Sequence, residues 1–123
     1  MEFKLYKCHD SIVIALNRDF DAKTAAKIRP IFDKLIDRAE GDMLVDLSAV
    51  LFLDSTGIGT LVHFYKKSKE KGKKLILIGA DGQPMGLMAM LRLNRIIKHF
   101  PSMEEYLVSS GKSHQADLEE ILK

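Results

Sequence analysis

Two short segments near the N-terminus have the hydrophobic pattern of β-strands. Residues 3–8 alternate between apolar and polar positions, and residues 12–16 form a continuous run rich in β-branched side chains. The intervening His9-Asp10-Ser11 is typical of a turn. Two strand-like segments around a turn predict a β-hairpin. Cys8 lies in the alternating segment, so we expect it to be a small core residue.

Further along the chain, apolar residues recur at steps of three and four, which predicts amphipathic helices. Asp21 or Thr24 is the expected N-cap of the first helix. Pro30 lies inside that helix, where proline removes a backbone hydrogen bond, so we expect a kink there or a new helix that begins at Pro30. The predicted helices cover about residues 25–39, 55–72, 84–91 and 103–108.

Short apolar runs bounded by polar residues lie between the predicted helices. Residues 43–47 and 75–78 predict buried central strands, and residues 96–100 predict a short edge strand. A turn is expected over residues 48–50. Strands that alternate with helices after a hairpin predict an α/β fold whose sheet is mixed but mostly parallel.

Composition narrows the classes of function. The 123 residues suit one domain, and the content of 46% hydrophobic and 29% charged residues allows an ordinary core. A net charge of +2 does not by itself indicate a nucleic-acid partner, and the absence of tryptophan disfavours a stacking platform for single strands. No apolar run approaches the roughly 20 residues of a membrane span. A single cysteine fits the reducing cytoplasm.

The junction over residues 51–60 is the candidate functional centre. It joins a predicted strand to a predicted helix, whose first backbone N–H groups lack intrahelical partners and carry partial positive charge. Either Asp54 or Ser55 can cap those donors. Gly57 and Gly59 keep the first turn slim, so we expect another molecule to come close to the backbone there.

The junction lacks the residues that catalysis or cofactor binding would need. Ser55 is not in a G-x-S-x-G elbow, and no lysine follows the glycines as in a nucleotide-binding loop. The aromatic pair that would sandwich a flavin is absent, and the four histidines show no metal-ligand spacing. We therefore predict no enzyme, no metal and no cofactor. Four acids could gather at one end of the sheet, although the simplest interpretation is that they cap helices: Asp19, Asp21, Asp46 and Asp54.

Six lysines follow the helix after the junction: Lys66, Lys67, Lys69, Lys71, Lys73 and Lys74. The simplest interpretation is a solvated helix end, where positive charge interacts favourably with the helix dipole. Contact with an acidic partner is the alternative.

The run Asp54-Ser55-Thr56-Gly57-Ile58-Gly59 resembles the D-S-[ST]-G-[IL]-G signature of anti-sigma factor antagonists, the single-domain STAS proteins. The order of the elements extends the resemblance to about residues 1–108. It implies the STAS fold, a mixed sheet with an N-terminal hairpin and with helices packed mainly on one face. Residues 109–123 lie outside it, and we expect a loosely ordered tail or a short helix there.

The resemblance implies a switch in bacterial transcription regulation that acts in the cytoplasm and has no direct contact with nucleic acid or membrane. Ser55 matches the phosphoacceptor serine, with Thr56 as the second choice. The implied partners are a protein kinase that doubles as an anti-sigma factor and binds the unphosphorylated form, and a PP2C-type phosphatase. The residues expected to contact a partner are Asp21, Asp54, Thr56, Gly57, Ile58 and Gly59.

Two features depart from the family pattern. Arg18 stands where related sequences often have glycine, which places a bulky cation near the rim of the expected site, and Pro30 is unusual in the first helix. A different class of function also stays open, namely a constitutive STAS adaptor, for example a subunit of a lipid-transport assembly. Such an adaptor would dock a partner through the same helix without phosphorylation.

Overall fold

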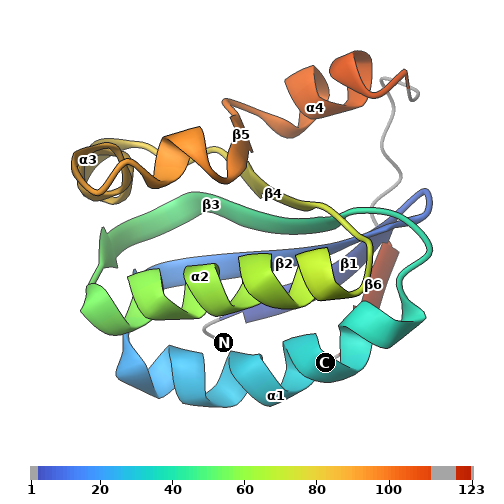
Figure 1. Ribbon diagram of the computed structural model, residues 1–123, viewed down its shortest axis with the longest axis horizontal. Coiled ribbons are helices and arrows are strands. Elements are labelled where there is room, and N and C mark those ends of the chain that lie inside the picture. The colour runs from blue at the N-terminus through green and yellow to red at the C-terminus, as the bar shows by residue number, and fades with distance from the viewer. Residues whose placement is uncertain (1–2, 112–118, 123) are drawn as a thin grey trace.

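The computed structural model describes residues 3–111 and 119–122, which form one mixed sheet flanked by helices (Figure 1). The strand order is β5-β4-β3-β2-β1-β6, in which β1 is antiparallel to β2 and β6 and the other neighbours are parallel. The predicted α/β fold with an N-terminal hairpin is therefore confirmed. In chain order the elements are β1 (Phe3–Cys8), β2 (Ser11–Phe20), α1 (Ala22–Arg38), β3 (Met43–Leu53), α2 (Ser55–Glu70), β4 (Leu75–Ile78), α3 (Gly82–Met90), the 3₁₀ turn η1 (Leu93–Arg95), β5 (Lys98–Phe100), α4 (Met103–Ser109) and β6 (Glu119–Leu122).

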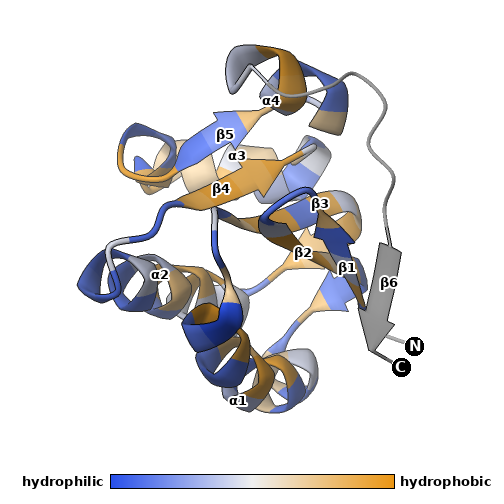
Figure 2. Ribbon diagram, turned by 90° about the vertical axis from the view of Figure 1, so that its right-hand side faces the viewer, coloured by the Kyte–Doolittle hydropathy of each residue, from blue (hydrophilic) through white to orange (hydrophobic). Residues whose placement is uncertain are grey.

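The sheet has a core on each face, and the larger core lies under most of the helices. α1, α2 and α3 contribute to the larger core, where the rings of Phe32 and Phe64 stack with their centroids 4.0 Å apart. α4 covers the opposite face with Tyr106 and Leu107, and Cys8 is buried there as expected. Figure 2 shows the apolar strand β4 with α1 and α2 on one side of the sheet and α4 on the other. Helices that pack mainly on one face are thus confirmed.

β2 and β3 are both longer than their hydrophobic patterns predict. The turn expected over residues 48–50 is wrong, because β3 continues through it to Leu53 and pairs with β2 as far as Phe20. Two register shifts absorb the extra residues, and Arg18, in one of them, has a left-handed φ of 59°. Each strand satisfies backbone hydrogen bonds of the other, which explains why polar residues there remain extended.

Helix α1 begins at Ala22 and runs through Pro30, so the alternative of a new helix at Pro30 is wrong. Pro30 is exposed, which lets its ring extend into solvent. The short helix expected in the tail is also wrong for Glu119–Leu122, which pair antiparallel with β1 as β6. Backbone groups at the edge of a sheet offer hydrogen bonds that a lone helical turn cannot match. Residues 112–118 and 123 of that tail lie outside the described residues.

Candidate functional site

Helices α1 and α2 begin side by side at one edge of the sheet. Phe20 at the end of β2 lies opposite Leu53 at the end of β3, and the backbone N–H of Asp54 donates to the Phe20 carbonyl at 3.5 Å. The residues that follow the two strand ends, Asp21 and Asp54, are therefore neighbours at this edge (Figure 1). The structure thus brings together two of the four aspartates that the sequence singles out.

Each of these two aspartates caps its own helix. The Asp54 carboxylate accepts from the Gly57 N–H at 2.8 Å, and the Asp21 carboxylate accepts from the Thr24 N–H at 3.1 Å. These bonds satisfy backbone donors that have no partner within the helix. The choice between Asp54 and Ser55 as the cap of α2 is therefore resolved for Asp54, and the choice between Asp21 and Thr24 in α1 for Asp21.

Ser55 and Thr56 follow the cap as the first two residues of α2, and both are exposed. Within residues 3–111 and 119–122 neither hydroxyl makes a hydrogen bond or another polar contact. The Thr56 carbonyl is engaged, because it accepts from the Thr60 hydroxyl at 2.8 Å. Two accessible hydroxyls thus lie at the positive end of a 16-residue helix, beside a carboxylate that already serves as its cap.

Gly57 and Gly59 have different environments. A Cβ on Gly57 would lie 2.3 Å from the Phe20 carbonyl oxygen and 2.5 Å from a methyl carbon of Leu53, whereas a Cβ on Gly59 would have nothing within 4 Å. The expectation that Gly57 leaves space for another molecule is wrong, because the end of β2 fills that space. Gly57 instead lets α2 begin against the strand, while Gly59 is exposed and open.

The other two aspartates do not join this edge. Asp46 lies in the body of β3, where its carboxylate accepts from the Ser48 N–H at 2.9 Å and from the Ser48 hydroxyl at 2.6 Å. Asp19 is exposed near the end of β2. No three His, Cys, Asp or Glu side chains in the described residues come together as metal ligands. In the same part of the chain, no helix combines the length and apolar character that a membrane crossing requires.

Two exposed apolar side chains beside the caps were not singled out by the sequence. Leu51 is 71% exposed and Phe52 is 48% exposed, and both lie in the last part of β3, directly before Asp54. Their signal is hidden in the sequence, since an apolar run before a helix is more readily interpreted as core. Large apolar groups at the surface beside a polar site are typical of a protein–protein contact.

A side-chain amide of α3 attaches this edge to the rest of the sheet. The Leu53 N–H donates to the Gln83 side-chain oxygen at 2.8 Å, and the Gln83 amide nitrogen donates to the Leu53 carbonyl at 2.9 Å. Gln83 therefore satisfies both backbone groups of the last residue of β3, as a neighbouring strand would. The position at which α2 begins is fixed from β2 on one side and from α3 on the other.

The lysines that follow α2 connect its far end to α1. The Lys71 ammonium lies 3.0 Å from the Asp37 carboxylate, and the Lys73 ammonium donates to the Ile36 carbonyl. The hydrogen bond and the positive charge of Lys71 lower the pKa of Asp37. Lys66, Lys69, Lys71 and Lys74 are exposed, which agrees with a largely solvated helix end.

Comparisons with known proteins find the same fold and one family. The STAS domain family model matches residues 4–106. The anti-sigma-B factor antagonist of Listeria monocytogenes is 31% identical over 90 residues, which are 72% of this chain and 78% of that protein. The structure of an anti-sigma-factor antagonist (STAS) domain protein from Planctomyces limnophilus superposes with a TM-score of 0.77 at 17% identity, covering 91% of this chain and all of that one. Unphosphorylated SpoIIAA, an anti-sigma factor antagonist, gives a TM-score of 0.69 at 18% identity, covering 89% and 96%.

Proposed function

Since this chain belongs to the STAS domain family, we propose that it acts as an anti-sigma factor antagonist whose partner is switched by phosphorylation of Ser55. The unphosphorylated protein binds a cytoplasmic kinase that is also the anti-sigma factor. The kinase modifies Ser55, and a PP2C-type phosphatase restores the hydroxyl. The name of the Listeria relative supports the general role.

The observation that carries the proposal is the capping of α2 by Asp54. Because Asp54 satisfies the Gly57 N–H, the Ser55 hydroxyl is not needed to begin the helix and is exposed to solvent. A kinase can therefore engage it without opening the fold. Thr56 shares this exposure and is the second-choice acceptor.

The same geometry explains how one phosphate changes binding but not folding. Phosphorylation adds about −1.5 to −2 charge and three acceptor oxygens, which the start of a helix accommodates. The new group would lie beside the carboxylates of Asp54 and Asp21, so a partner shaped for a neutral hydroxyl would meet concentrated negative charge. A switch from 99% to 1% bound needs about 5.5 kcal/mol of differential affinity. Burying an unpaired dianion in an interface costs at least several kcal/mol, which is the same range.

The proposed docking surface combines this polar edge with the adjacent apolar side chains. Leu51 and Phe52 supply apolar area, Ile58 is half-buried on α2, and Gly59 allows close approach to the helix. Asp21, Asp54 and Thr56 form its polar part. An apolar patch with polar groups around it is the usual anatomy of a protein interface.

Mapping the phosphorylation site tests the proposal. Wild-type protein is incubated with the cognate kinase and ATP, and the product is mapped by mass spectrometry; Ser55→Ala, Thr56→Val and, as a matched exposed serine, Ser109→Ala are treated in parallel. We expect Ser55→Ala alone to abolish incorporation. Phosphate on a residue other than Ser55 or Thr56 would refute the site.

The adaptor function makes a different prediction for Ser55→Asp. The switch requires this variant to lose the kinase in a pull-down while its circular dichroism spectrum stays unchanged. A constitutive adaptor would retain its partners, because the exposed Leu51 and Phe52 are available with or without a charge at residue 55. Loss of fold would instead show that the serine has a structural role.

A further inference from the structure

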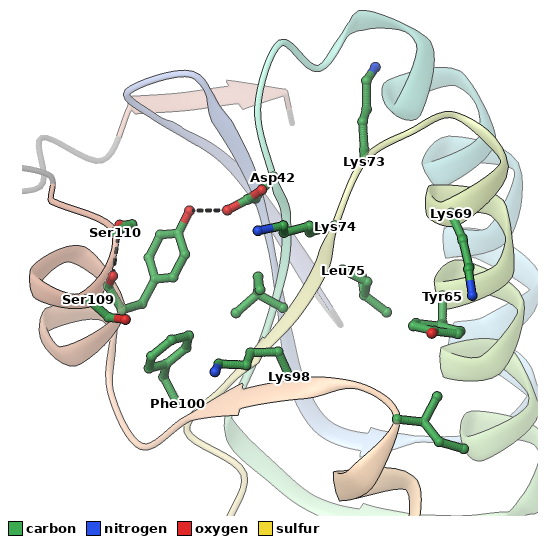
Figure 3. A pocket seen from close by; sticks show the side chains of 13 residues that line it. Asp42, Tyr65, Lys69, Lys73, Lys74, Leu75, Lys98, Phe100, Ser109 and Ser110 are labelled. Atoms are coloured by element: carbon green, nitrogen blue, oxygen red, sulfur yellow. Dashed lines mark hydrogen bonds between the residues drawn. The ribbon is translucent and has the colours of Figure 1, made fainter.

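A groove of about 540 Å³ lies at the end of α2 remote from Ser55. It runs between α4 and the last turns of α2, across the beginnings of β4 and β5 (Figure 3). Its volume is within the range of sites that hold small molecules, about 300–1,000 Å³. None of the residues of the Ser55 edge lines it, so its occupant is independent of the proposed switch.

The groove carries a surplus of unpaired positive charge. Lys69, Lys74 and Lys98 line it, and within residues 3–111 and 119–122 none of the three has a carboxylate at ion-pair distance. Figure 3 shows the side chains of Lys74 and Lys98 extending toward the same side of the groove. A fourth lining lysine, Lys73, is directed elsewhere, to the Ile36 carbonyl.

Asp42 is the acidic residue in the lining, and it is already engaged. Its carboxylate accepts from the Tyr106 hydroxyl at 2.7 Å, and the Tyr106 hydroxyl in turn lies 3.2 Å from the hydroxyl of buried Ser11. One carboxylate so engaged cannot neutralise three ammonium groups. The groove is therefore complementary to an anion.

Between the lysines the lining is apolar and aromatic. Phe100 and Tyr65 present rings near the cations, with the Lys98 ammonium 5.5 Å from the Phe100 centroid and the Lys69 ammonium 6.0 Å from the Tyr65 centroid. Leu75, Ile76 and Ile96 add aliphatic surface. A bare inorganic ion would leave this surface unused, whereas a ligand with an apolar body would cover it.

The backbone that carries the two inward lysines is held by the sheet. Lys98 is in β5 opposite Ile76 of β4, and the Lys74 carbonyl accepts from the Met43 N–H at 2.9 Å. The charged groups are thus spaced by the strands before any ligand arrives, which lowers the entropic cost of binding.

We propose that this groove binds a small amphipathic anion, an aromatic phosphate or carboxylate whose charged group lies between Lys74 and Lys98 and whose ring packs against Phe100. Ser109 and Ser110 at the end of α4 also line the groove, and the Ser110 hydroxyl is already engaged with the Tyr106 carbonyl at 2.8 Å. The site would let a small metabolite act on the protein at a distance from the docking edge.

The test follows backbone amide shifts by NMR during titration of the full chain with 1-naphthyl phosphate, with inorganic phosphate and 1-naphthol as the two partial ligands. We expect saturable shifts confined to the groove, and binding at least about tenfold tighter than for either partial ligand, because charge and apolar contacts both contribute. The double variant Lys74→Gln/Lys98→Gln should weaken binding about tenfold. Lys74→Arg/Lys98→Arg, which keeps both charges, should bind within about threefold of the wild type.

Lys66→Gln is the matched control, since Lys66 is an exposed lysine of α2 outside the groove. It should change the affinity less than twofold, an ordinary effect for a remote surface charge. Three results would overturn the proposal: no groove shifts at millimolar 1-naphthyl phosphate, equal weakening by Lys66→Gln and by the double glutamine variant, or equal affinity for inorganic phosphate. Phosphorylation of Ser55 is measured separately, so failure here leaves the proposed function intact.

Discussion

Gly57→Ala is the sharpest test of how the edge is built. The added methyl group would lie 2.3 Å from the Phe20 carbonyl oxygen and 2.5 Å from a methyl carbon of Leu53. Both distances are far inside van der Waals contact. The Phe20 carbonyl also accepts from the Asp54 N–H, so it cannot move without loosening the start of α2.

The size of the effect follows from two opposing terms. Overpacking costs about 1–3 kcal/mol, and contact with backbone puts this site near the upper end. Alanine returns up to about 1 kcal/mol of helix propensity over glycine. We therefore expect a net loss of about 2 kcal/mol in the free energy of unfolding. With a urea dependence of about 2 kcal/mol per molar, the unfolding midpoint falls by about 1 M.

Gly59→Ala is the matched control, because it lies in the same helix and its Cβ would meet nothing within 4 Å. Only the propensity term applies, so its midpoint should rise by up to about 0.5 M, equivalent to about 1 kcal/mol. Urea titrations followed by circular dichroism at 222 nm measure both variants. A Gly57→Ala midpoint equal to or above that of the wild type would refute the assigned packing role.

Three further substitutions have measurable consequences. Arg18→Gly should stabilise the fold by about 0.5–1 kcal/mol in the same urea assay, because it relieves the left-handed φ of 59°; a lower midpoint would show that the arginine side chain contributes more than the strain costs. Tyr106→Phe should destabilise by about 2 kcal/mol, since it removes a buried hydroxyl that donates to the Asp42 carboxylate, and an unchanged midpoint would contradict this. Burial lowers the pKa of His99, whose neutral ring accepts from the Ala80 N–H at 3.1 Å, so its contribution to stability is complete above the ordinary pKa of 6.5 and is lost as the pH falls below that value toward the lowered pKa. Melting temperatures between pH 7.5 and 5.5 should therefore fall more steeply for wild type than for His99→Gln, and parallel profiles would rule out the histidine as their cause.

Much of the fold follows from short-range patterns in the sequence. The strand predicted at 75–78 is β4, the helix predicted from residue 55 begins there, and Asp21 was one of two expected caps. These features depend on periodicity and on hydrogen bonds between residues three or four apart, which a local pattern encodes. The run from Asp54 to Gly59 belongs to the same class, because its residues are contiguous.

The errors and omissions arise where distant residues decide the outcome. β3 extends through the predicted turn because β2 lies beside it, and Glu119–Leu122 form a strand because the edge of β1 is available. Neither pairing leaves a mark in the pattern of one segment. Backbone hydrogen bonding between segments therefore overrides local preference at both places.

By itself, the sequence determined the order of the elements, the presence of hydroxyls and glycines at the start of one helix, and the likeness to a phosphorylated switch. Only the tertiary structure decided that Asp54 caps α2 and leaves Ser55 free, and that Gly57 is buried while Gly59 is open. It also assembled a lysine-lined groove from residues between Asp42 and Ser110. The physical reason is range: composition and periodicity act over one or two turns, whereas packing contacts, exposure and the summation of charge depend on which distant segments the sheet brings together.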